Sequence, residues 1–268
     1  MKKSSLLWRI EGPGLTAPSY IFGTMHMIEK EYYFFPEKVE KLLLETEELV
    51  MELPGLPSRE ESMELLTLKE GSFFDYFTKE QSDSLYQWAS KNLSMREALF
   101  RKTMDSMKPF VFVQLATQLN FIGKMEYYEQ AFESLAQTNK IPISGLETVA
   151  DQMLIFDNLS KAQQTEMVME SIRNPEKVMQ QTREMEQLYV DQNVDQLYIN
   201  IIKAESVIVD EQSAFLDNRN SRWIPLIIQH MKLHPTFVAV GAGHLGGPNG
   251  VVRLLQREGY TLTPIRIK

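Results

Sequence analysis

Four residues with acid–base or metal-ligand side chains occupy the same place in the pattern of short apolar segments. His26, Glu52, Glu147 and His244 each come at, or just after, the end of such a segment. In open parallel sheets, ligands bind outside the carboxyl ends of the strands, and neighbouring strands lie about 4.8 Å apart. The four side chains are therefore expected to meet at one small site, although they span most of the sequence.

Both of these histidines close a Gly-x-x-His motif, and they are two of the only four histidines in the chain. Two imidazoles with one or two carboxylates are a usual ligand set for Zn, Mn or Co in a hydrolytic site. A metal held there lowers the pKa of its water toward about 7, and a spare carboxylate, Glu52 or Glu147, can accept the proton. The opposing interpretation is a pair of histidines held by backbone hydrogen bonds at strand ends.

The glycines of the two motifs have a physical role of their own. At Gly23, Gly241 and Gly243 the missing Cβ lets the backbone turn sharply or approach a ligand closely. One Gly-x-x-His string is a weak signal because it occurs by chance in many proteins. Two copies, each closing a predicted strand, are more specific.

Hydrophobic periodicity predicts the elements that position these residues. Short apolar runs predict strands at residues 6–10, 19–24, 49–53, 141–144, 236–240 and 260–267. Helical spacing predicts helices at residues 36–48, 79–92, 109–122, 148–159 and 251–258, with further helices up to about residue 231. The strand, helix, strand order over residues 19–53 indicates a βαβ unit and a parallel sheet. Pro264 favours a sheet edge for the last strand.

These elements together predict an α/β fold. We expect a mixed, largely parallel central sheet with strands from both ends of the chain, and a large helical cap formed by the middle. Residues 1–268 are expected to form a single domain, with cap segments at about 57–140 and 150–232. The chain is 43% hydrophobic and 24% charged, which is the composition of a globular protein with a sizeable core.

Charge and composition exclude several classes of function. The net charge is −8 without a run of basic residues, which argues against a nucleic-acid partner. The chain has no cysteine, so disulfides, thiolate ligands and a cysteine nucleophile are excluded. No apolar run approaches the roughly 20 residues of a membrane span. The apolar stretch that follows Lys3 stops at Arg9, short of a signal-peptide core of about 7–15 residues, which predicts a cytoplasmic protein, or an exported one if a signal segment has been removed.

The chain resembles the TraB/GumN family, which includes the Tiki proteases that inactivate Wnt ligands and bacterial pheromone-shutdown proteins. The resemblance rests on the two Gly-x-x-His motifs, on Val-Met-Glu-Leu at residues 50–53, on Gly-Leu-Glu-Thr at 145–148 and on Asn-Arg-Asn at 218–220. The segment from 250 to 264 also fits. The resemblance covers nearly the whole chain, and it is least specific over residues 57–135.

This resemblance implies metal-dependent hydrolysis, with proteolysis established for some members. It implies a divalent metal, Mn, Co or Zn, held by His26, Glu52 and His244. Arg219 is then a charge-stabilising or substrate-anchoring group at the catalytic site, with Asn220 beside it. The opposing interpretation of Arg219 is a structural bidentate pair with a carboxylate.

Three functions remain open at this point. The first is a metal-dependent hydrolase that cleaves a peptide or a small-molecule amide or ester. The second is a non-catalytic module on the same scaffold that binds a ligand or peptide. The helical middle of the chain, which is rich in Met and aromatic residues, favours this hypothesis. The third is a metal-independent esterase with His26 as base and a carboxylate as its partner.

Overall fold

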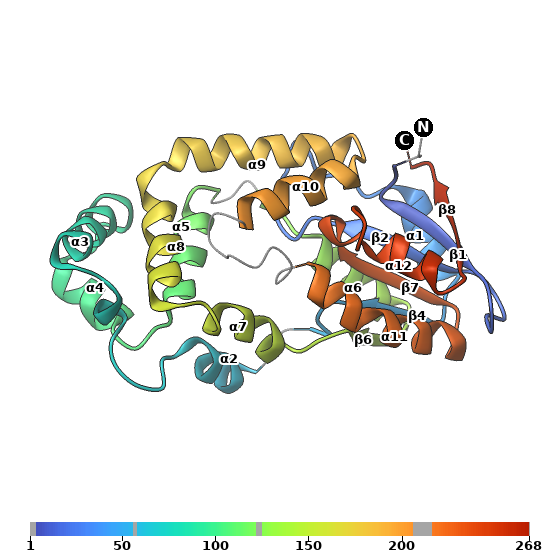
Figure 1. Cartoon of the computed structure of the whole chain (residues 1–268), viewed down its shortest axis with the longest axis horizontal. Helices are drawn as coiled ribbons and strands as arrows, with labels where there is room; N and C mark the ends of the chain where they lie inside the picture. The colour runs from blue at the N-terminus through green and yellow to red at the C-terminus, as the bar shows by residue number, and fades with distance from the viewer. Residues whose placement is uncertain (1–3, 56–57, 122–124, 206–215, 268) are drawn as a thin grey trace. The chain divides into compact units, whose positions relative to one another are not determined.

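The computed structural model describes residues 4–55, 58–121, 125–205 and 216–267, and it contains a six-stranded sheet (Figure 1). The order across the sheet is β6 (Ile143–Gly145), β4 (Glu48–Met51), β7 (Thr236–Gly241), β2 (Ser19–Thr24), β1 (Leu7–Glu11) and β8 (Thr261–Ile265). The first four strands are mutually parallel, whereas β1 pairs antiparallel with both β2 and β8. A small antiparallel sheet joins β3 (Ile28–Glu29) to β5 (Met125–Glu126).

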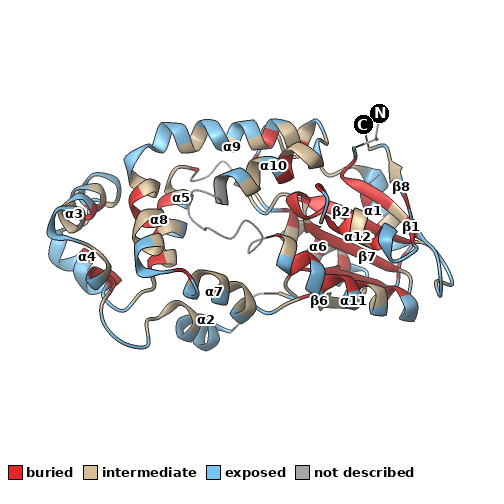
Figure 2. Cartoon of the chain, in the orientation of Figure 1, coloured by how far each residue is buried: buried red, intermediate tan, exposed pale blue. Residues whose placement is uncertain are grey.

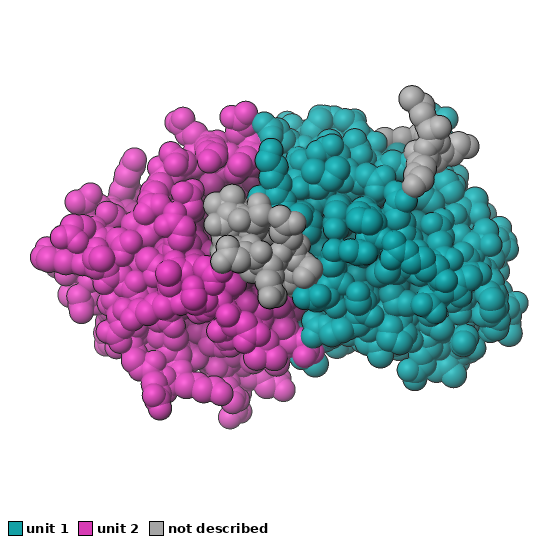
Figure 3. Space-filling model, in the orientation of Figure 1, with its two compact units in different colours: residues 1–56, 124–148, 183–268 teal, residues 57–123, 149–182 magenta. Residues whose placement is uncertain are grey.

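The chain divides into two compact units, which Figure 3 colours separately. Unit 1 comprises Met1–Leu56, Lys124–Thr148 and Arg183–Lys268 and contains both sheets. Its helices are α1 (Glu37–Leu44), α6 (Tyr128–Thr138), α10 (Val194–Glu205), α11 (Asp217–Leu233), α12 (Val251–Arg257) and the short 3-10 turn η2 (Ala242–His244). Unit 2 comprises Pro57–Gly123 and Val149–Thr182. Its helices are α2 (Arg59–Leu66), η1 (Phe73–Tyr76), α3 (Lys79–Leu93), α4 (Glu97–Met104), α5 (Pro109–Leu119), α7 (Val149–Asp157) and α8 (Lys161–Arg173), and α9 (Pro175–Val190) contributes residues to both units.

The core of unit 1 forms around the parallel strands. Every residue of β2 and β4 is buried, and β7 is buried up to its last residue (Figure 2). Parallel strands that are covered on both faces have nearly continuous apolar sequences, which explains the apolar runs at residues 49–51 of β4 and 237–240 of β7. Helix α6 packs on the sheet through Phe132, whose ring lies 5.7 Å from that of Phe22 and 5.6 Å from that of Phe237.

Unit 2 is built from helices around a separate aromatic core. Phe73, Phe100 and Phe112 are buried there, with ring centroids 6.0 Å apart for Phe73 and Phe112 and for Phe100 and Phe112. Capping boxes mark the starts of α3 and α8, because the side chains of Thr78 and Ser160 each accept the N–H of the third helical residue. The local sequence thus defines where these helices begin.

The observed topology confirms the predicted α/β fold with a mixed, largely parallel sheet. Strands from both ends of the chain enter it, and β2 and β4 run parallel with β7 between them, as expected of the βαβ unit. Strand β8 lies at the sheet edge, which is the place that Pro264 favours.

Some predicted helices are too long, among them those at 36–48, at 109–122 and at 148–159, the last of which is observed as Val149–Asp157. The helix predicted at 36–48 ends at Leu44, because the Thr46 hydroxyl donates to the Leu43 carbonyl at 2.7 Å and the N–H of Glu47 already donates to Pro235 beside the sheet. The helix predicted at 109–122 ends at Leu119, and residue 122 lies outside the described residues. No helix in the described ranges has the length and apolarity needed to cross a bilayer.

A buried carboxylate joins α9 to the small sheet. The side chain of Glu186 is fully buried, and its Oε1 accepts the backbone N–H of Glu29 at 2.6 Å. Its Oε2 has no hydrogen-bond partner among the described residues. Burial raises the pKa of Glu186, and the hydrogen bond from Glu29 offsets only part of that effect.

The substitution Glu186→Gln is expected to stabilise the protein at pH 7. The folded-state pKa of Glu186 lies above its ordinary value of 4.5, so the wild type loses stability as the pH rises from 4.5 through the folded-state pKa. The glutamine keeps the acceptor for Glu29 and never ionises. Urea unfolding should therefore show a gain in the free energy of unfolding at pH 7 that vanishes well below pH 4.5, whereas an equal difference at both pH values contradicts the assignment.

Candidate active site

The carboxyl ends of the four parallel strands lie along one edge of the sheet. Strands β2 and β7 stay in register up to Thr24 and Gly241, and β4 and β6 end together. Beyond that end, the N–H of Glu147 donates to the carbonyl of Glu52 at 3.0 Å, so the two chains remain side by side. This register places four of the predicted site residues at the same edge: His26, Glu52, Glu147 and His244.

Glu52 lies between the two imidazoles. Its Oε1 accepts the N–H of Gly241 at 2.8 Å, and the same oxygen is 3.6 Å from Nε2 of His26 and 3.8 Å from Nε2 of His244. Both rings thus present the same nitrogen to one buried carboxylate oxygen.

Because Gly241 has no side chain, the carboxylate of Glu52 and the ring of His26 have room to approach each other beside it. A Cβ at this position would lie 3.2 Å from Oε1 of Glu52 and 3.6 Å from Nε2 of His26. The first of these distances is tighter than ordinary van der Waals contact, so a side chain here would press on the carboxylate. The glycine is therefore needed at this position for close approach.

Arg219 forms the centre of the buried cluster. It lies in the first turn of α11, and its guanidinium donates to Oε2 of Glu52 and to Oε1 of Glu147. Its Nε also lies 3.1 and 3.2 Å from the two oxygens of Glu147. The guanidinium carbon lies 4.7 Å from the ring centroid of Trp223, one helical turn later, whose indole N–H donates to Glu147 at 3.2 Å. Arg219 therefore forms the ion pair with a carboxylate that was considered as the opposing interpretation of its role. It pairs with two carboxylates, those of Glu52 and Glu147.

His244 is the buried imidazole of the site. Its Nδ1 lies 2.6 Å from Oδ1 of Asn220, whose amide nitrogen donates to the carbonyl of Asn249 at 2.9 Å. Because the second bond fixes the amide, we assign the hydrogen to Nδ1 of His244. The free lone pair of Nε2 then accepts from Arg219 at 3.2 Å. Burial lowers the pKa of His244 to about 3 despite the carboxylate of Glu52, so the ring is neutral at pH 7.

His26, unlike the buried and neutral His244, is exposed to solvent and positively charged. Its Nδ1 lies 2.6 Å from Oε1 of Glu129, an oxygen that also accepts the Thr24 hydroxyl at 3.1 Å. Partial desolvation of the ring lowers the pKa of His26, but the carboxylates of Glu52 and Glu129 outweigh it and raise the pKa to about 9. The ring is therefore charged at neutral pH.

The ionisation of Glu52 follows from its neighbours. Burial by itself raises the pKa of this carboxyl group. The imidazoles of His244 and His26 lower it, the Arg219 guanidinium and the Gly241 N–H add to their effect, and the resulting pKa is about 2. Glu52 is thus a carboxylate across the range in which proteins are folded and active.

Two site residues were not found from the sequence. Glu129 is the second residue of α6, whereas the sequence pattern pointed only to strand ends, and an acidic residue in a first helical turn is common in any helix. Trp223 could have been found, because it follows Arg219 by four residues on one predicted helix and therefore shares its face.

The remaining two histidines lie away from the cluster. His230 contacts Glu48, the first residue of β4, at 2.9 Å, which places it at the amino end of that strand. His234 ends α11 as its C-cap residue and lies 3.4 Å from Glu47.

The types of donor group at the site, imidazole and carboxylate, are those that bind divalent metal ions. Two imidazole nitrogens and one carboxylate face each other, and each Nδ1 is held by a side-chain oxygen, as is usual for metal-binding histidines. As the side chains stand, however, no group of three or more histidine and acidic residues in the described ranges is arranged to hold a metal ion. Arg219 instead engages the carboxylate of Glu52 and the Nε2 of His244.

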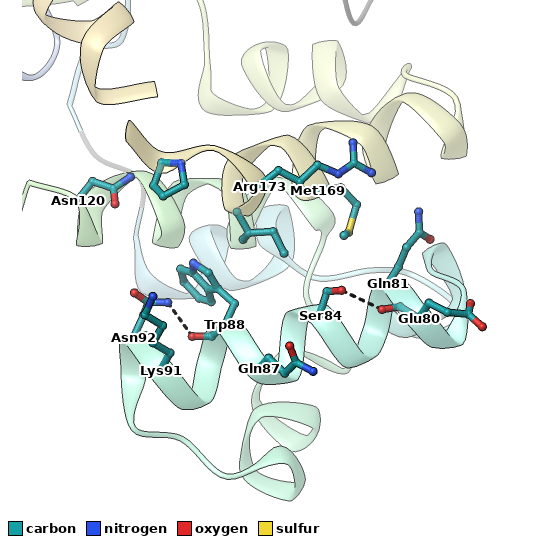
Figure 4. A pocket seen from close by; sticks show the side chains of 12 residues that line it. Glu80, Gln81, Ser84, Gln87, Trp88, Lys91, Asn92, Asn120, Met169 and Arg173 are labelled. Atoms are coloured by element: carbon teal, nitrogen blue, oxygen red, sulfur yellow. Dashed lines mark hydrogen bonds between the residues drawn. The ribbon is translucent and has the colours of Figure 1, made fainter. Parts of the chain in front are cut away.

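Unit 2 has a pocket of its own, with a volume of about 550 Å³ (Figure 4). Its wall combines the indole of Trp88 with the amide side chains of Gln81, Gln87, Asn92 and Asn120. Residues of α3 and α8 supply most of the lining, which belongs wholly to unit 2.

Fold and site together define an α/β protein with two histidines, two glutamates and one arginine gathered at the carboxyl edge of a parallel sheet. The sequence from residue 6 to residue 264 matches the model of the TraB/PrgY/gumN family. The chain belongs to this family, which confirms the resemblance drawn from its motifs. No curated protein and no solved structure gives a significant match to the chain.

Replacing Arg219 is expected to destabilise the fold strongly. Arg219→Leu leaves Glu52 and Glu147 as two buried, adjacent carboxylates, and removal of one partner from a buried ion pair costs about 3–5 kcal/mol. The exposed Arg222 on the same helix offers the matched control Arg222→Leu, which should change the free energy of unfolding by about 0.5 kcal/mol or less. Urea unfolding at pH 7 measures both, and similar values for the two variants contradict a central role for the buried guanidinium.

Proposed function

We propose that this chain is a metal-dependent hydrolase that activates water to cleave a peptide or a similar amide or ester bond. One observation carries the proposal. The Nε2 atoms of both motif histidines face the same oxygen of Glu52, at 3.6 and 3.8 Å, while a side-chain oxygen holds each Nδ1. Anchored rings with convergent nitrogens are characteristic of metal-binding histidines.

His26, His244 and Glu52 would hold the ion, with Mn, Co and Zn as the candidates. When bound, such an ion lowers the pKa of water toward about 7 and polarises a carbonyl group. His244 is suited to this part because it is neutral and its Nε2 lone pair faces the cluster.

The remaining charges of the cluster have separate roles in the proposal. The guanidinium of Arg219 is fixed by two carboxylates and by the indole of Trp223, so it supplies a preorganised positive charge for an oxyanion or a substrate carboxylate. The oxygens of Glu147 accept from Arg219 and from Trp223. These contacts favour a holding role for Glu147, and the low pKa of Glu52, about 2, favours its role as a ligand over that of proton acceptor.

A second candidate function is hydrolysis without a metal, with His26 and Glu129 as an acid–base pair. The 2.6 Å contact between them is the observation that favours it. Because the pKa of His26 is about 9, the ring serves as an acid at neutral pH and as a base only at higher pH. Metal-independent activity should therefore rise between pH 7 and pH 9.

Digestion of a peptide library, with Mn, Co and Zn added separately, tests the proposal. We expect cleavage that depends on metal. It should fall in His26→Ala and His244→Ala by more than the roughly 10–100-fold that loss of an outer-shell partner costs, since each substitution removes a ligand. His234→Ala is the matched control, because His234 is a histidine of the same unit outside the cluster, and it should retain full activity. Glu52→Gln should abolish turnover.

The possible outcomes separate the three functions. Cleavage that survives exhaustive chelation supports the His26–Glu129 pair in place of a metal. Stoichiometric peptide binding without cleavage under any metal indicates a binding module. Calorimetric titration that finds no metal binding by the wild type rejects the metal-dependent proposal.

A further inference from the structure

The two histidines of the site are held by different means. The side chain of His244 is 4% exposed, and its ring packs against Trp223 with a centroid distance of 4.3 Å. The side chain of His26 is 61% exposed and lies in the loop between β2 and β3. Packing restricts the rotamer of a buried ring, whereas an exposed ring gains little from packing and depends on hydrogen bonds for its direction.

Glu129 provides such a hydrogen bond from a well-fixed position. Its Oε1 lies 2.6 Å from Nδ1 of His26 and accepts the hydroxyl of Thr24, the last residue of β2, at 3.1 Å. The helix that carries Glu129 is anchored on the sheet through Phe132, one turn later, which packs on Phe22 of the same strand. Glu129 is therefore tied to β2 twice, once through its own side chain and once through its helix.

The chemistry of the two anchors matches their surroundings. The buried His244 is held by the neutral amide of Asn220, and the exposed His26 is held by a carboxylate. Hydrogen bonds to a charged group are roughly twice as strong as neutral ones, which suits a contact that competes with water.

We propose that Glu129 is a positioning residue, which holds Nδ1 of His26 so that Nε2 of that ring faces Glu52. The consequence for metal binding rests on the proposed function. The orientation of the ring does not, because it follows from contacts within the protein. Thr24 contributes by fixing the carboxylate oxygen that His26 uses.

Three variants separate positioning from a general effect of charge or of helix stability. Glu129→Ala removes the acceptor. Glu129→Gln keeps an oxygen acceptor without the charge, as Asn220 does for His244. Glu133→Ala removes an acidic side chain one turn later on the same helix and is the matched control.

The first measurement needs no metal. Proton–nitrogen NMR of the histidine side chains at fixed pH should show a slowly exchanging Nδ1–H of His26 in the wild type and in Glu133→Ala. The signal should weaken in Glu129→Gln and disappear in Glu129→Ala, with circular dichroism confirming that the variants are folded.

The second measurement is calorimetric titration with Mn²⁺ and with Zn²⁺. Loss of a group that orients a metal-binding histidine costs about 10–100-fold in metal affinity, so Glu129→Ala should weaken the Kd by that factor. Glu129→Gln should recover part of the loss, and Glu133→Ala should match the wild type.

The two measurements test the metal-dependent function and the positioning role of Glu129 separately. A wild type that binds no metal rejects the metal-dependent function, while the NMR experiment still decides the role of Glu129. An unchanged Nδ1–H signal in Glu129→Ala overturns the proposal. A changed signal with an unchanged Kd in a metal-binding wild type overturns its consequence for the metal. If Glu129→Ala does not fold, Glu129→Gln and Thr24→Val, which should each weaken the signal, decide in its place.

Discussion

The buried guanidinium of Arg219 is the interaction on which the rest of the candidate site depends. Glu52 and Glu147 follow neighbouring strands, and without a positive charge between them two buried carboxylates would repel each other at a high cost in desolvation. Arg219 also donates to Nε2 of His244, so one side chain of α11 joins the ends of β4 and β6 to the loop that follows β7. The geometry of the site is thus an electrostatic consequence of where this helix begins.

The same charge network makes two histidines of the same motif chemically unlike. His244 is buried next to the guanidinium and is neutral, with its lone pair turned toward the cluster. His26 faces solvent between two carboxylates and is charged at neutral pH. A motif of four residues does not specify this difference, which arises from what each ring faces in the folded chain.

The sequence predicted the position of the site better than its internal contacts. Apolar runs closed by glycine or by a turn mark the ends of strands, and parallel strands end at a common edge, so the placement of His26 and His244 follows from local patterns. Glu129 could not be found in this way, because its role arises from the packing of α6 on β2. The early end of the helix at Leu44 was missed for the same kind of reason, since Glu47 pairs with Pro235.

The strand order of the large sheet has a consequence for biosynthesis. Strand β1 pairs with β8, and β2 pairs with β7, so each of the first two strands has one of its two neighbours among the last two strands. Such long-range pairing slows folding because a long loop must close before any contact forms. A ribosome from which β7 has not yet emerged therefore holds a chain in which β2 can pair with β1 but lacks its second neighbour. The site can assemble only late in synthesis or after it, and until then the edges of β2 and β4 that pair with β7 remain unpaired.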